Sequence, residues 1–500
     1  MDNESSNDVL DFDCKLLKLA SYVISPALTT VFNSSLSQGK VPLDWKFSRV
    51  TPIYKGKDEK DTAGNYRPIS VIGHIAKVLK KLVQWQLLVY LISNDLISVD
   101  QSAYRPCHNT QTALHRVTDT WLEGICDGLM TGVCFLDIRK CFDSIDHELL
   151  KLKLSYYGIQ QKELEWFSNY LDNRSQVVCY DNSVSDVQNL DVGVPQGSVL
   201  GPILFTIFIN DVTQYVAEGT CNLYADDTVV YFQGKSCADI NTSLQMCIDQ
   251  LSEWYKDNKL SLNASKCEVM LISSQRRFIS DSLCINLDGQ QLNNVSCANY
   301  LGMKIDENVN WNVYVNKLCS NVYLKLKQLR RLVDVVSPEL LSKIYSSTIQ
   351  PCIDYAISVW GQTTDQNIIK IQRLQNLAAR IITQNFDIIN CRGIDIVKQL
   401  KWMNVKQRCH YFTVLLMFKC IYGLSPNYMS DNITMQFDVT GIETRSHPMN
   451  VYVPRPNCDM FKRTFAYCGA VSWNSLPSHI KDIHELNAFK KAFKQYVLSF

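Results

Sequence analysis

The sequence predicts a mixed α/β fold of the α+β type, in which an antiparallel sheet is combined with many helices. Residues 221–231 show an apolar run, two adjacent acids and a β-branched, aromatic run, which is the pattern of a strand, a tight turn and a second strand. Residues 132–136 form another apolar strand that leads into an acid. Apolar residues at helical spacing predict helices over 9–33, 75–92, 149–171, 239–258, 368–382 and 405–423.

Length and composition indicate a globular protein with two or three structural units. Its 500 residues exceed what one compact core usually holds. Apolar residues make up 46% of the chain and charged residues 20%, which excludes a disordered chain. The formal net charge of +1 argues against a histone-like basic surface. A basic groove that is balanced by acidic surface elsewhere is compatible with this charge.

Nineteen cysteines are scattered along the chain, and no two form a Cys-x-x-Cys pair. Because the number is odd and many lie inside apolar runs, we expect reduced, mostly buried thiols in an intracellular protein of the nucleus, the cytoplasm or both, not a secreted one. Cys391, Cys409, His410 and Cys420 lack the spacing of zinc ligands, so no zinc site is predicted. The first residues have no signal-peptide core, and no apolar run is long enough to predict a membrane span.

The adjacent acids Asp226 and Asp227 are predicted to lie at the tip of the hairpin. Two neighbouring carboxylates repel each other, and a bound cation such as Mg²⁺ would explain the pair. A solvated turn is the alternative, because Asp is common in turns. A metal site for nucleotidyl transfer needs a further carboxylate from another strand, and Asp137 supplies one. Whether Asp137 approaches the hairpin depends on the tertiary fold.

Three segments occur in the order of the palm motifs of reverse transcriptases: 135–143 (FLDIRKCFD), 193–202 (GVPQGSVLGP) and 224–227 (YADD). With its flanking segments, the chain resembles the reverse transcriptases of non-LTR (LINE-type, jockey-like) retrotransposons. The ordered set is far more specific than any single motif. The resemblance implies a right-hand polymerase with fingers, a palm built on an antiparallel sheet, and a thumb.

The resemblance also implies a division of the chain. We expect an N-terminal helical extension over 1–47, fingers and palm over 48–305, a thumb-like helical region over 306–360 and a helical C-terminal region of unknown role over 361–500. Complete elements of this type usually carry an endonuclease. The residues before 40 leave no room for one, so the chain is expected to be a fragment that lacks it.

For catalysis, the resemblance implies that Asp137, Asp226 and Asp227 hold two Mg²⁺ ions, with Mn²⁺ as an alternative. The ions would support in-line attack of a primer 3′-hydroxyl on a deoxynucleoside triphosphate. Lys266 lies in a segment (LSLNASKCE, 260–268) that resembles the palm loop near the leaving pyrophosphate. A surface lysine before a strand would show the same local sequence.

The nucleotide pocket is expected to include Arg67 near the triphosphate and Phe142 under the sugar. An aromatic ring there leaves no room for a 2′-hydroxyl, which predicts use of deoxynucleotides. Gln196 and Gly197 are implied to contact template and nucleotide, and Tyr224 belongs to the same pocket. The alternatives are a core phenylalanine for Phe142 and a plain turn before a helix for residues 196–197.

Other residues are expected to contact nucleic acid. Arg105 is a candidate for contact with the template backbone, and Arg174 is a candidate for contact with nucleic acid. The segment Tyr300-Leu301-Gly302 resembles the hairpin that holds the primer 3′ end. Residues 309–333 contain no acid but several bases, including Lys325 and Lys327, which favours a thumb helix along a duplex backbone. A solvated helix face is the alternative.

The predicted function is RNA-directed DNA polymerase activity, with an RNA template, a DNA primer and deoxynucleoside triphosphates as partners and no membrane. Two alternatives remain open. A catalytically silent relic could keep the fold and bind RNA, although the intact carboxylates favour activity. A maturase-like cellular reverse transcriptase is the other, and the LINE-like flanking segments disfavour it. The sequence gives no indication of oligomeric state.

Overall fold

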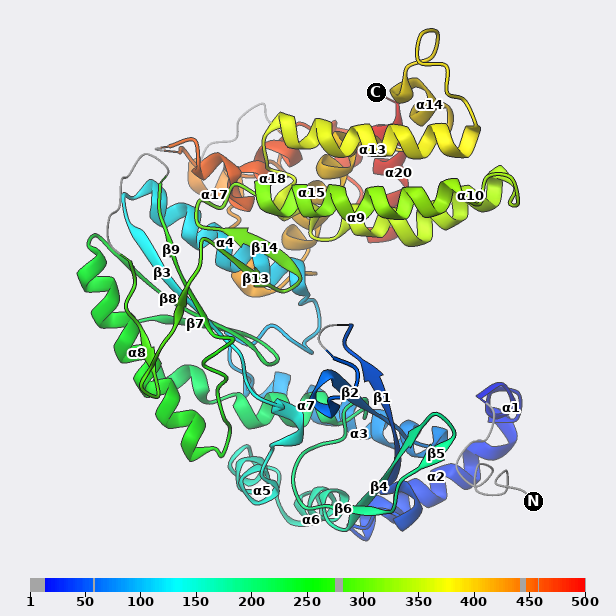
Figure 1. Cartoon of the computed structure of the whole chain (residues 1–500), viewed down its shortest axis with the longest axis vertical. Helices are drawn as coiled ribbons and strands as arrows, with labels where there is room; N and C mark the ends of the chain where they lie inside the picture. Colours follow the sequence, from blue (N-terminus) through cyan, green and yellow to red (C-terminus); the bar gives the residue numbers. More distant parts are fainter. Residues whose placement is uncertain (1–13, 57–58, 275–281, 441–446, 457, 500) are drawn as a thin grey trace.

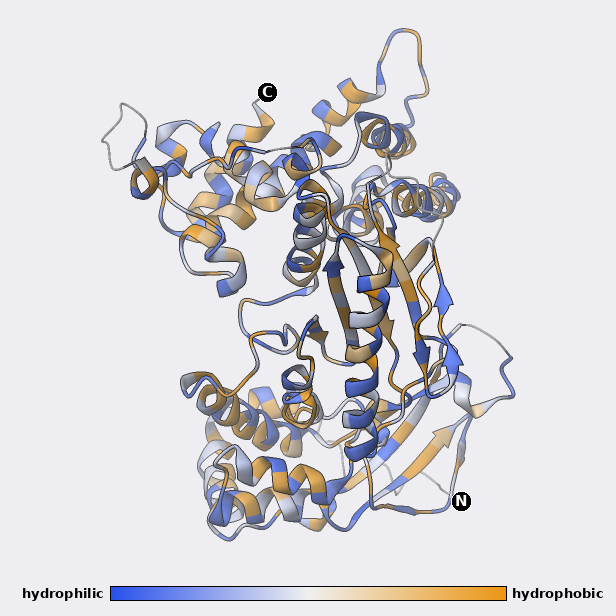
Figure 2. Ribbon diagram, turned by 90° about the vertical axis from the view of Figure 1, so that its left-hand side faces the viewer, coloured by the Kyte–Doolittle hydropathy of each residue, from blue (hydrophilic) through white to orange (hydrophobic). Residues whose placement is uncertain are grey.

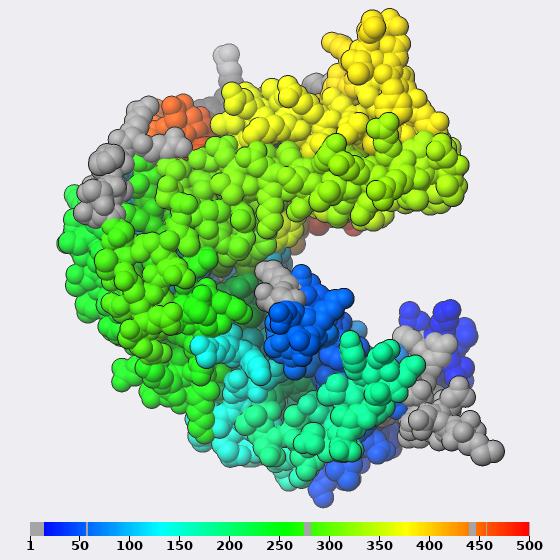
Figure 3. Space-filling model, viewed as in Figure 1, coloured from blue at the N-terminus to red at the C-terminus, as the bar shows by residue number. Residues whose placement is uncertain are grey.

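The computed structural model describes residues 14–56, 59–274, 282–440, 447–456 and 458–499. The chain curves around an open channel, which Figures 1 and 3 show from the same side. A central sheet forms the inside of the curve, a second sheet with its helices lies on one side of the channel, and long helices lie on the other. The predicted mixed α/β class is therefore confirmed.

The central sheet has the strand order β12-β9-β3-β8-β7, and all pairings except that of β12 with β9 are antiparallel. Its strands are β3 (Met130–Leu136), β7 (Thr220–Tyr224), β8 (Asp227–Gly234), β9 (Glu268–Ile272) and β12 (Asn293–Asn294). All seven residues of β3 are buried, which explains its uninterrupted apolar sequence. The predicted strand over 132–136 and the hairpin over 221–231 are both confirmed.

Helices cover both faces of this sheet. Because side chains alternate along a strand, each strand contributes side chains to both faces. On one face, α8 (Cys237–Asp257) approaches so closely that a Cβ at Gly132 would lie 2.2 Å from Ile240. On the other face, Trp121 of α4 (Thr110–Cys126) packs edge-on against Phe135. Figure 2 shows α8 in front of the strands with hydrophilic residues on its outer side. Strand β3 therefore contributes to two separate hydrophobic cores.

The second sheet has the order β2-β1-β4-β5, with β6 beside β4. Strand β1 pairs antiparallel with β2 and parallel with β4. The strands are β1 (Phe47–Tyr54), β2 (Tyr66–Val71), β4 (Arg174–Tyr180), β5 (Ser183–Val184) and β6 (Gln188–Leu190). The helices near it share the core beneath α8, and they are α2 (Ser21–Ser37), α3 (His74–Ser93), α5 (His147–Tyr156), α6 (Gln161–Leu171) and α7 (Gly201–Ile209).

The predicted helices of this half are largely confirmed. The helices predicted over 75–92 and 239–258 are α3 and α8, and 149–171 holds α5 and α6. The predicted helix over 9–33 is instead two helices, α1 (Cys14–Leu19) and α2, and residues 9–13 lie outside the described residues. In the described part of the chain, no helix is both long and apolar enough to cross a bilayer.

Long helices form the opposite side of the channel. One hydrophobic core joins α4 and the central sheet to three of the helices, which are α9 (Asn312–Arg330), α12 (Ile357–Trp360) and α13 (Asp365–Thr383). A separate core joins α15 (Val405–Ile421), α18 (Phe465–Asn474) and α20 (Leu486–Leu498) through Phe418, Trp473 and Phe489. The remaining helices after residue 330 are α10 (Pro338–Ile344), α11 (Gln350–Asp354), α14 (Gly393–Gln399), α16 (Asn427–Ser430), α17 (Gln436–Thr440) and α19 (Ser478–Lys481).

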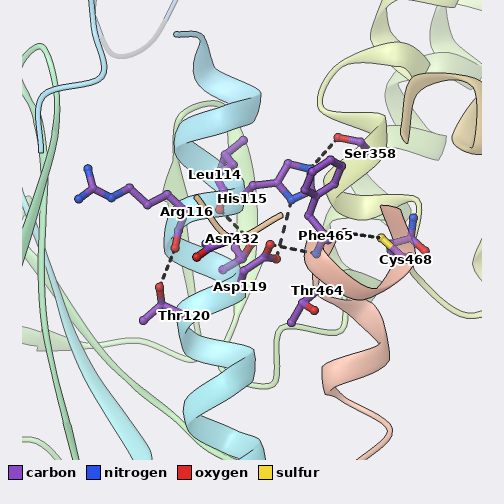
Figure 4. A network of polar contacts seen from close by, with 12 residues as sticks. Leu114, His115, Arg116, Asp119, Thr120, Ser358, Asn432, Thr464, Phe465 and Cys468 are labelled. Atoms are coloured by element: carbon purple, nitrogen blue, oxygen red, sulfur yellow. Dashed lines mark hydrogen bonds and ion pairs between the residues drawn. The ribbon is translucent and has the colours of Figure 1, made fainter. Parts of the chain in front are cut away.

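Polar contacts join α4 to these helices (Figure 4). The His115 Nε2 atom lies 2.7 Å from the Ser358 hydroxyl, and the Asp119 carboxylate accepts a hydrogen bond from the Phe465 backbone N–H at 2.9 Å. His115 and Ser358 are buried. These contacts connect α4 to α12 and α18.

A disulfide between Cys126 and Cys458 also links α4 to the C-terminal region. The expectation that all cysteines are reduced is therefore wrong for this pair, since residues 332 positions apart meet only in the folded chain. Other cysteines of the described residues are free thiols, and many of them are buried, as expected.

The C-terminal core leads to a stability prediction. Phe493 is completely buried in α20 and lies parallel to Tyr411, with ring centroids 5.4 Å apart. Phe493→Ala should lower the free energy of unfolding of the C-terminal core by about 3–5 kcal/mol, because it leaves a cavity. Phe437→Ala, at a side chain that is 53% exposed, should change it by less than about 0.5 kcal/mol. Denaturant unfolding followed by circular dichroism measures both, and equal effects would contradict the packing described here.

Candidate active site

The hairpin of β7 and β8 turns through two residues, Ala225 and Asp226, because Tyr224 pairs with Asp227. Ala225 takes the left-handed conformation (φ +55°), which suits a two-residue hairpin turn. The Gln101 side-chain oxygen accepts hydrogen bonds from the backbone N–H of Ala225 (3.1 Å) and of Ala103 (2.8 Å). Gln101 is completely buried, so it fixes the turn from below. Sequence analysis missed this residue, since only the fold brings it to the hairpin.

The register of the central sheet brings the third carboxylate to the hairpin. Leu136 at the end of β3 lies opposite Thr228, and in an antiparallel pair the next residues are Asp137 and Asp227. Asp137 lies just beyond the strand, where its backbone N–H points to the Cys267 sulfur (3.4 Å) and its carbonyl accepts from Asn263 (2.8 Å). The three acids singled out in the sequence therefore converge at one end of the sheet.

The electrostatics of the three acids are unfavourable without a counter-charge. Desolvation, and then the negative charges of Asp226 and Asp137, raise the pKa of Asp227 to about 6. Asp227 remains exposed to solvent, so its desolvation is incomplete. Asp226 accepts a weak hydrogen bond from the Cys141 thiol at 3.4 Å. The arrangement concentrates negative charge at a surface of the channel.

These acids provide the donor set that Mg²⁺ prefers, since they offer only oxygen ligands. Within the described ranges, no three His, Cys, Asp or Glu side chains are already arranged as a metal cluster. Magnesium usually keeps several waters and binds substrate phosphates as well as one or two carboxylates, so a closed cage of protein ligands is not required. The raised pKa of Asp227 marks the uncompensated charge that a divalent cation would relieve.

Lys266 lies at the edge of this acidic cluster. Its Nζ atom is 3.8 Å from the Asp137 carboxylate, and its side chain is 68% exposed. The residue belongs to the loop before β9, which the hydrogen bonds of Asn263 and Cys267 tie to Asp137. The expected position beside the acids is thus present, and an exposed ion pair of this length adds little to stability.

The loop over 194–198 lies between the two sheets. The Ser70 backbone N–H on β2 donates to the Gln196 carbonyl at 2.7 Å, and the Gln196 amide donates to both oxygens of Asp143 at 3.0 and 3.1 Å. Gly197 has φ +92°, and a Cβ there would lie 3.2 Å from the Ser70 carbonyl. Glycine is therefore required where this loop crosses β2.

Two further residues of the expected nucleotide pocket differ in their surroundings. Phe142 packs on Phe205 of α7, with ring centroids 4.8 Å apart, and remains partly exposed. The exposed side chain of Arg67 on β2 makes no hydrogen bond or ion pair with other described residues. Tyr224 is partly buried, and burial raises the pKa of its hydroxyl. Among the described residues, the Arg67 guanidinium therefore has no partner, whereas Phe142 is a partly exposed ring that also packs against the core.

The expected primer hairpin is formed by β13 (Cys297–Tyr300) and β14 (Met303–Asp306). Leu301 (φ +45°) and Gly302 (φ +77°) make its turn. The Tyr355 hydroxyl donates to the Leu301 carbonyl at 2.5 Å, a contact that sequence analysis did not find. Tyr300 is only 4% exposed, so this part of the hairpin offers backbone, and not the tyrosine ring, to a ligand.

Several expected nucleic-acid contacts have partners within the chain. Arg105 donates to the carbonyls of Ser98 (2.8 Å) and Gln101 (3.1 Å), and Lys325 donates to the Thr348 carbonyl (2.8 Å). Lys327 lies over the ring of Tyr323. These three stay predictions. Arg174 is completely buried, so the expectation that it contacts nucleic acid is wrong.

Comparison with known proteins agrees with this geometry. The family described as "Reverse transcriptase (RNA-dependent DNA polymerase)" matches residues 55–305, and the chain belongs to this family. It is 29% identical over 370 residues to the probable RNA-directed DNA polymerase from transposon X-element, and 28% identical over 366 residues to the RNA-directed DNA polymerase from mobile element jockey, both of Drosophila melanogaster. The predicted resemblance to jockey-like, non-LTR elements is therefore confirmed.

Coverage limits these likenesses. Each match includes 71% of this chain but 40% of the relative, so the chain spans about two fifths of the length of these relatives. Among solved structures, a Candida tropicalis telomerase in complex with a fragment of telomeric RNA is 11% identical with a TM-score of 0.37, covering 76% of this chain and 68% of that one. The truncated apo telomerase from the same species is 12% identical with a TM-score of 0.36, covering 57% of this chain and 58% of that one. These scores are too low to support a detailed comparison.

The crowding of the acids leads to a pH-dependent prediction for the metal-free protein. Between pH 3.8 and about 6 the native Asp227 binds a proton more tightly than the unfolded one, so its contribution to stability falls as the pH rises through this window. Asp227→Asn should therefore raise the free energy of unfolding at about pH 8 by about 1 kcal/mol, a value reduced for solvent screening. The gain should shrink as the pH falls towards 4.

Denaturant unfolding in a chelating buffer measures this effect. Asp186→Asn, at an exposed acid in the loop between β5 and β6, is the matched control and should show no gain. A destabilised Asp227→Asn protein at about pH 8 would contradict the electrostatic account.

Proposed function

We propose that this chain is an RNA-directed DNA polymerase that extends a DNA primer on an RNA template with deoxynucleoside triphosphates. The observation that carries the proposal is the convergence of Asp137, Asp226 and Asp227 at one end of the central sheet, in a chain of the reverse transcriptase family. The negative charges of these acids repel one another, and this repulsion is unfavourable unless a bound ligand compensates it.

The proposal includes a right-hand arrangement. Residues 48–305, with both sheets, would form fingers and palm, and 306–360 a thumb-like region, between an N-terminal extension over 1–47 and a C-terminal region over 361–500. The open channel between the second sheet and α9 (Figure 3) supports this assignment, because the central sheet, whose strands β3 and β8 end at the three acids, lies at its base (Figure 1). Template and primer would lie in this channel.

Asp137, Asp226 and Asp227 would hold two Mg²⁺ ions, or Mn²⁺ in their place. When bound, the ions would lower the pKa of the primer hydroxyl and neutralise the charge of the triphosphate. The protein supplies the geometry: Gln101 fixes the turn that carries Asp226, and the β3–β8 register fixes Asp137 beside it. Because no side-chain nucleophile takes part, positioning and electrostatics account for the rate.

Other residues would orient the substrates. Lys266 would stabilise the charge of the leaving pyrophosphate from its position beside Asp137. Arg67 would bind triphosphate oxygens with its guanidinium. Gln196 and Gly197 would contact the template base and nucleotide, and Tyr224 would line the same pocket. Template or primer would be contacted by Arg105, the turn Tyr300–Gly302, Lys325 and Lys327. Where these side chains already have partners, the contact would be made chiefly through backbone atoms.

Removing one acid tests the proposal directly. Asp226→Asn should reduce extension of an oligo-dT primer on poly(rA) by at least about a hundredfold, because one of the carboxylates that would hold the ions is lost, while RNA binding in a filter assay remains. Asp186→Asn should extend the primer like wild type.

Two outcomes would decide against the proposal. Equal extension by wild type and Asp226→Asn would show that the acids do not act in catalysis. A wild-type protein that binds RNA but extends no primer in Mg²⁺ or Mn²⁺ would favour the silent RNA-binding relic.

Phe142 provides a test of sugar selection. Phe142→Ala should raise the incorporation of ribonucleotides relative to deoxynucleotides by roughly tenfold or more, because it removes the ring expected under the sugar. Phe142→Tyr keeps the ring and should keep the selectivity of wild type. Steady-state incorporation of single nucleotides measures the ratio. An active Phe142→Ala enzyme with unchanged selectivity would mean that the ring serves only the core contact with Phe205.

A further inference from the structure

Three cationic side chains are buried together between the second sheet and its helices. Phe47 pairs with Ser175 in the parallel register of β1 and β4, so the preceding residues, Lys46 and Arg174, are neighbours on one face. Lys80 reaches the same place from α3. The exposed fractions are 3% for Lys46, 1% for Lys80 and 0% for Arg174.

Two of these cations make cation–π contacts with the same aromatic ring of α6. The Lys80 Nζ atom lies 5.3 Å from the centre of the Tyr170 ring, and the Arg174 guanidinium carbon lies 4.9 Å from it. Such contacts compensate only part of the cost of burying a charge. The arrangement therefore needs further stabilisation.

The described residues provide no paired anion for this cluster. No carboxylate among them lies within ion-pair distance of Lys46, Lys80 or Arg174. Asp172, whose negative charge acts on Lys46, forms its ion pair with Lys151 at 2.9 Å. Lys80 donates one hydrogen bond to the Trp45 carbonyl at 3.3 Å. Burial, with the charges of Arg174 and Lys77, lowers the pKa of Lys80 to about 7.

Several buried donors in this place are unused. Arg174 donates from Nη1 to the Tyr170 carbonyl at 3.2 Å, but its Nε and Nη2 atoms have no partner. The hydroxyls of Tyr170 and Ser48 are also buried without a partner, and Ser48 shares the sheet face of Lys46. The Nε and Nη2 atoms form one edge of the guanidinium, which matches two oxygens of an oxyanion in a bidentate contact. A guanidinium stays charged under all ordinary conditions, so this edge needs an acceptor.

We propose that Arg174, Lys80 and Lys46 form a buried binding site for a small inorganic oxyanion of the phosphate or sulfate type, with Tyr170 and Ser48 as hydroxyl donors. The anion supplies the missing counter-charge and joins β1 and β4 to α3 and α6. An oxyanion fits better than a halide, because the unused donors include a two-point guanidinium edge. The burial of Arg174 and Lys80 excludes the phosphates of nucleic acid and of nucleotides as the ligand.

The test is thermal unfolding of the full chain with sodium phosphate or sodium sulfate, compared with sodium chloride at equal ionic strength. The unfolding midpoint of wild type should rise saturably with phosphate and sulfate, by roughly 2–4 °C at about ten times the apparent Kd, and not with chloride. Arg174→Met should lose this shift. Arg373→Met, at an exposed arginine of α13, is the matched control and should keep it.

A second variant covers the case in which Arg174→Met does not fold. Arg174→Lys keeps the charge but removes the bidentate edge, and equilibrium dialysis with labelled phosphate should show binding weakened by roughly tenfold or more. The affinity of any phosphate that binds elsewhere, for example in the channel, is not changed by Arg174→Lys. The proposal is overturned if phosphate and sulfate give no shift, if chloride gives the same shift, or if the Arg174 variants bind phosphate like wild type.

Discussion

The pairing of β3 with β8 is the constraint on which the candidate site depends. Its antiparallel register sets Leu136 opposite Thr228 and so brings Asp137 beside the hairpin acids. Both faces of β3 are buried, one beneath α8 and one beneath α4. A slip of one residue would exchange the two faces of the strand and separate the acids, so core packing and site geometry are fixed by the same contacts.

Two charged clusters of opposite sign illustrate different uses of burial. The acids lie at the open channel, where a cation and a substrate can reach them and where repulsion raises the pKa of Asp227. The cations Lys46, Lys80 and Arg174 lie between the second sheet and its helices, where the proposed oxyanion would compensate them. The second sheet also contacts the loop over 194–198, because β1 pairs with β2 and the Ser70 backbone N–H of β2 donates to the Gln196 carbonyl.

The C-terminal helices are part of the same framework and not a loose tail. The Tyr428 hydroxyl lies 3.2 Å from both the Ser102 and Thr112 hydroxyls, and the guanidinium of Arg116 lies over its ring. Ser102 follows Gln101, which fixes the turn of the hairpin acids. Together with the disulfide of Cys126 and Cys458, these contacts connect residues beyond 400 to the base of the channel.

Alternation, helical spacing and ordered motifs are encoded by neighbouring residues. They therefore predicted the hairpin over 221–231, the helices α3 and α8, the three acids and the family. Three features depend on the packing of distant elements: the support of the two turns by Gln101 and Tyr355, the burial of Arg174, and the meeting of two distant cysteines. An arginine in a polar segment has the same local sequence whether it faces solvent or a core. Burial and long-range pairing arise from how whole elements pack, and no short segment contains that information.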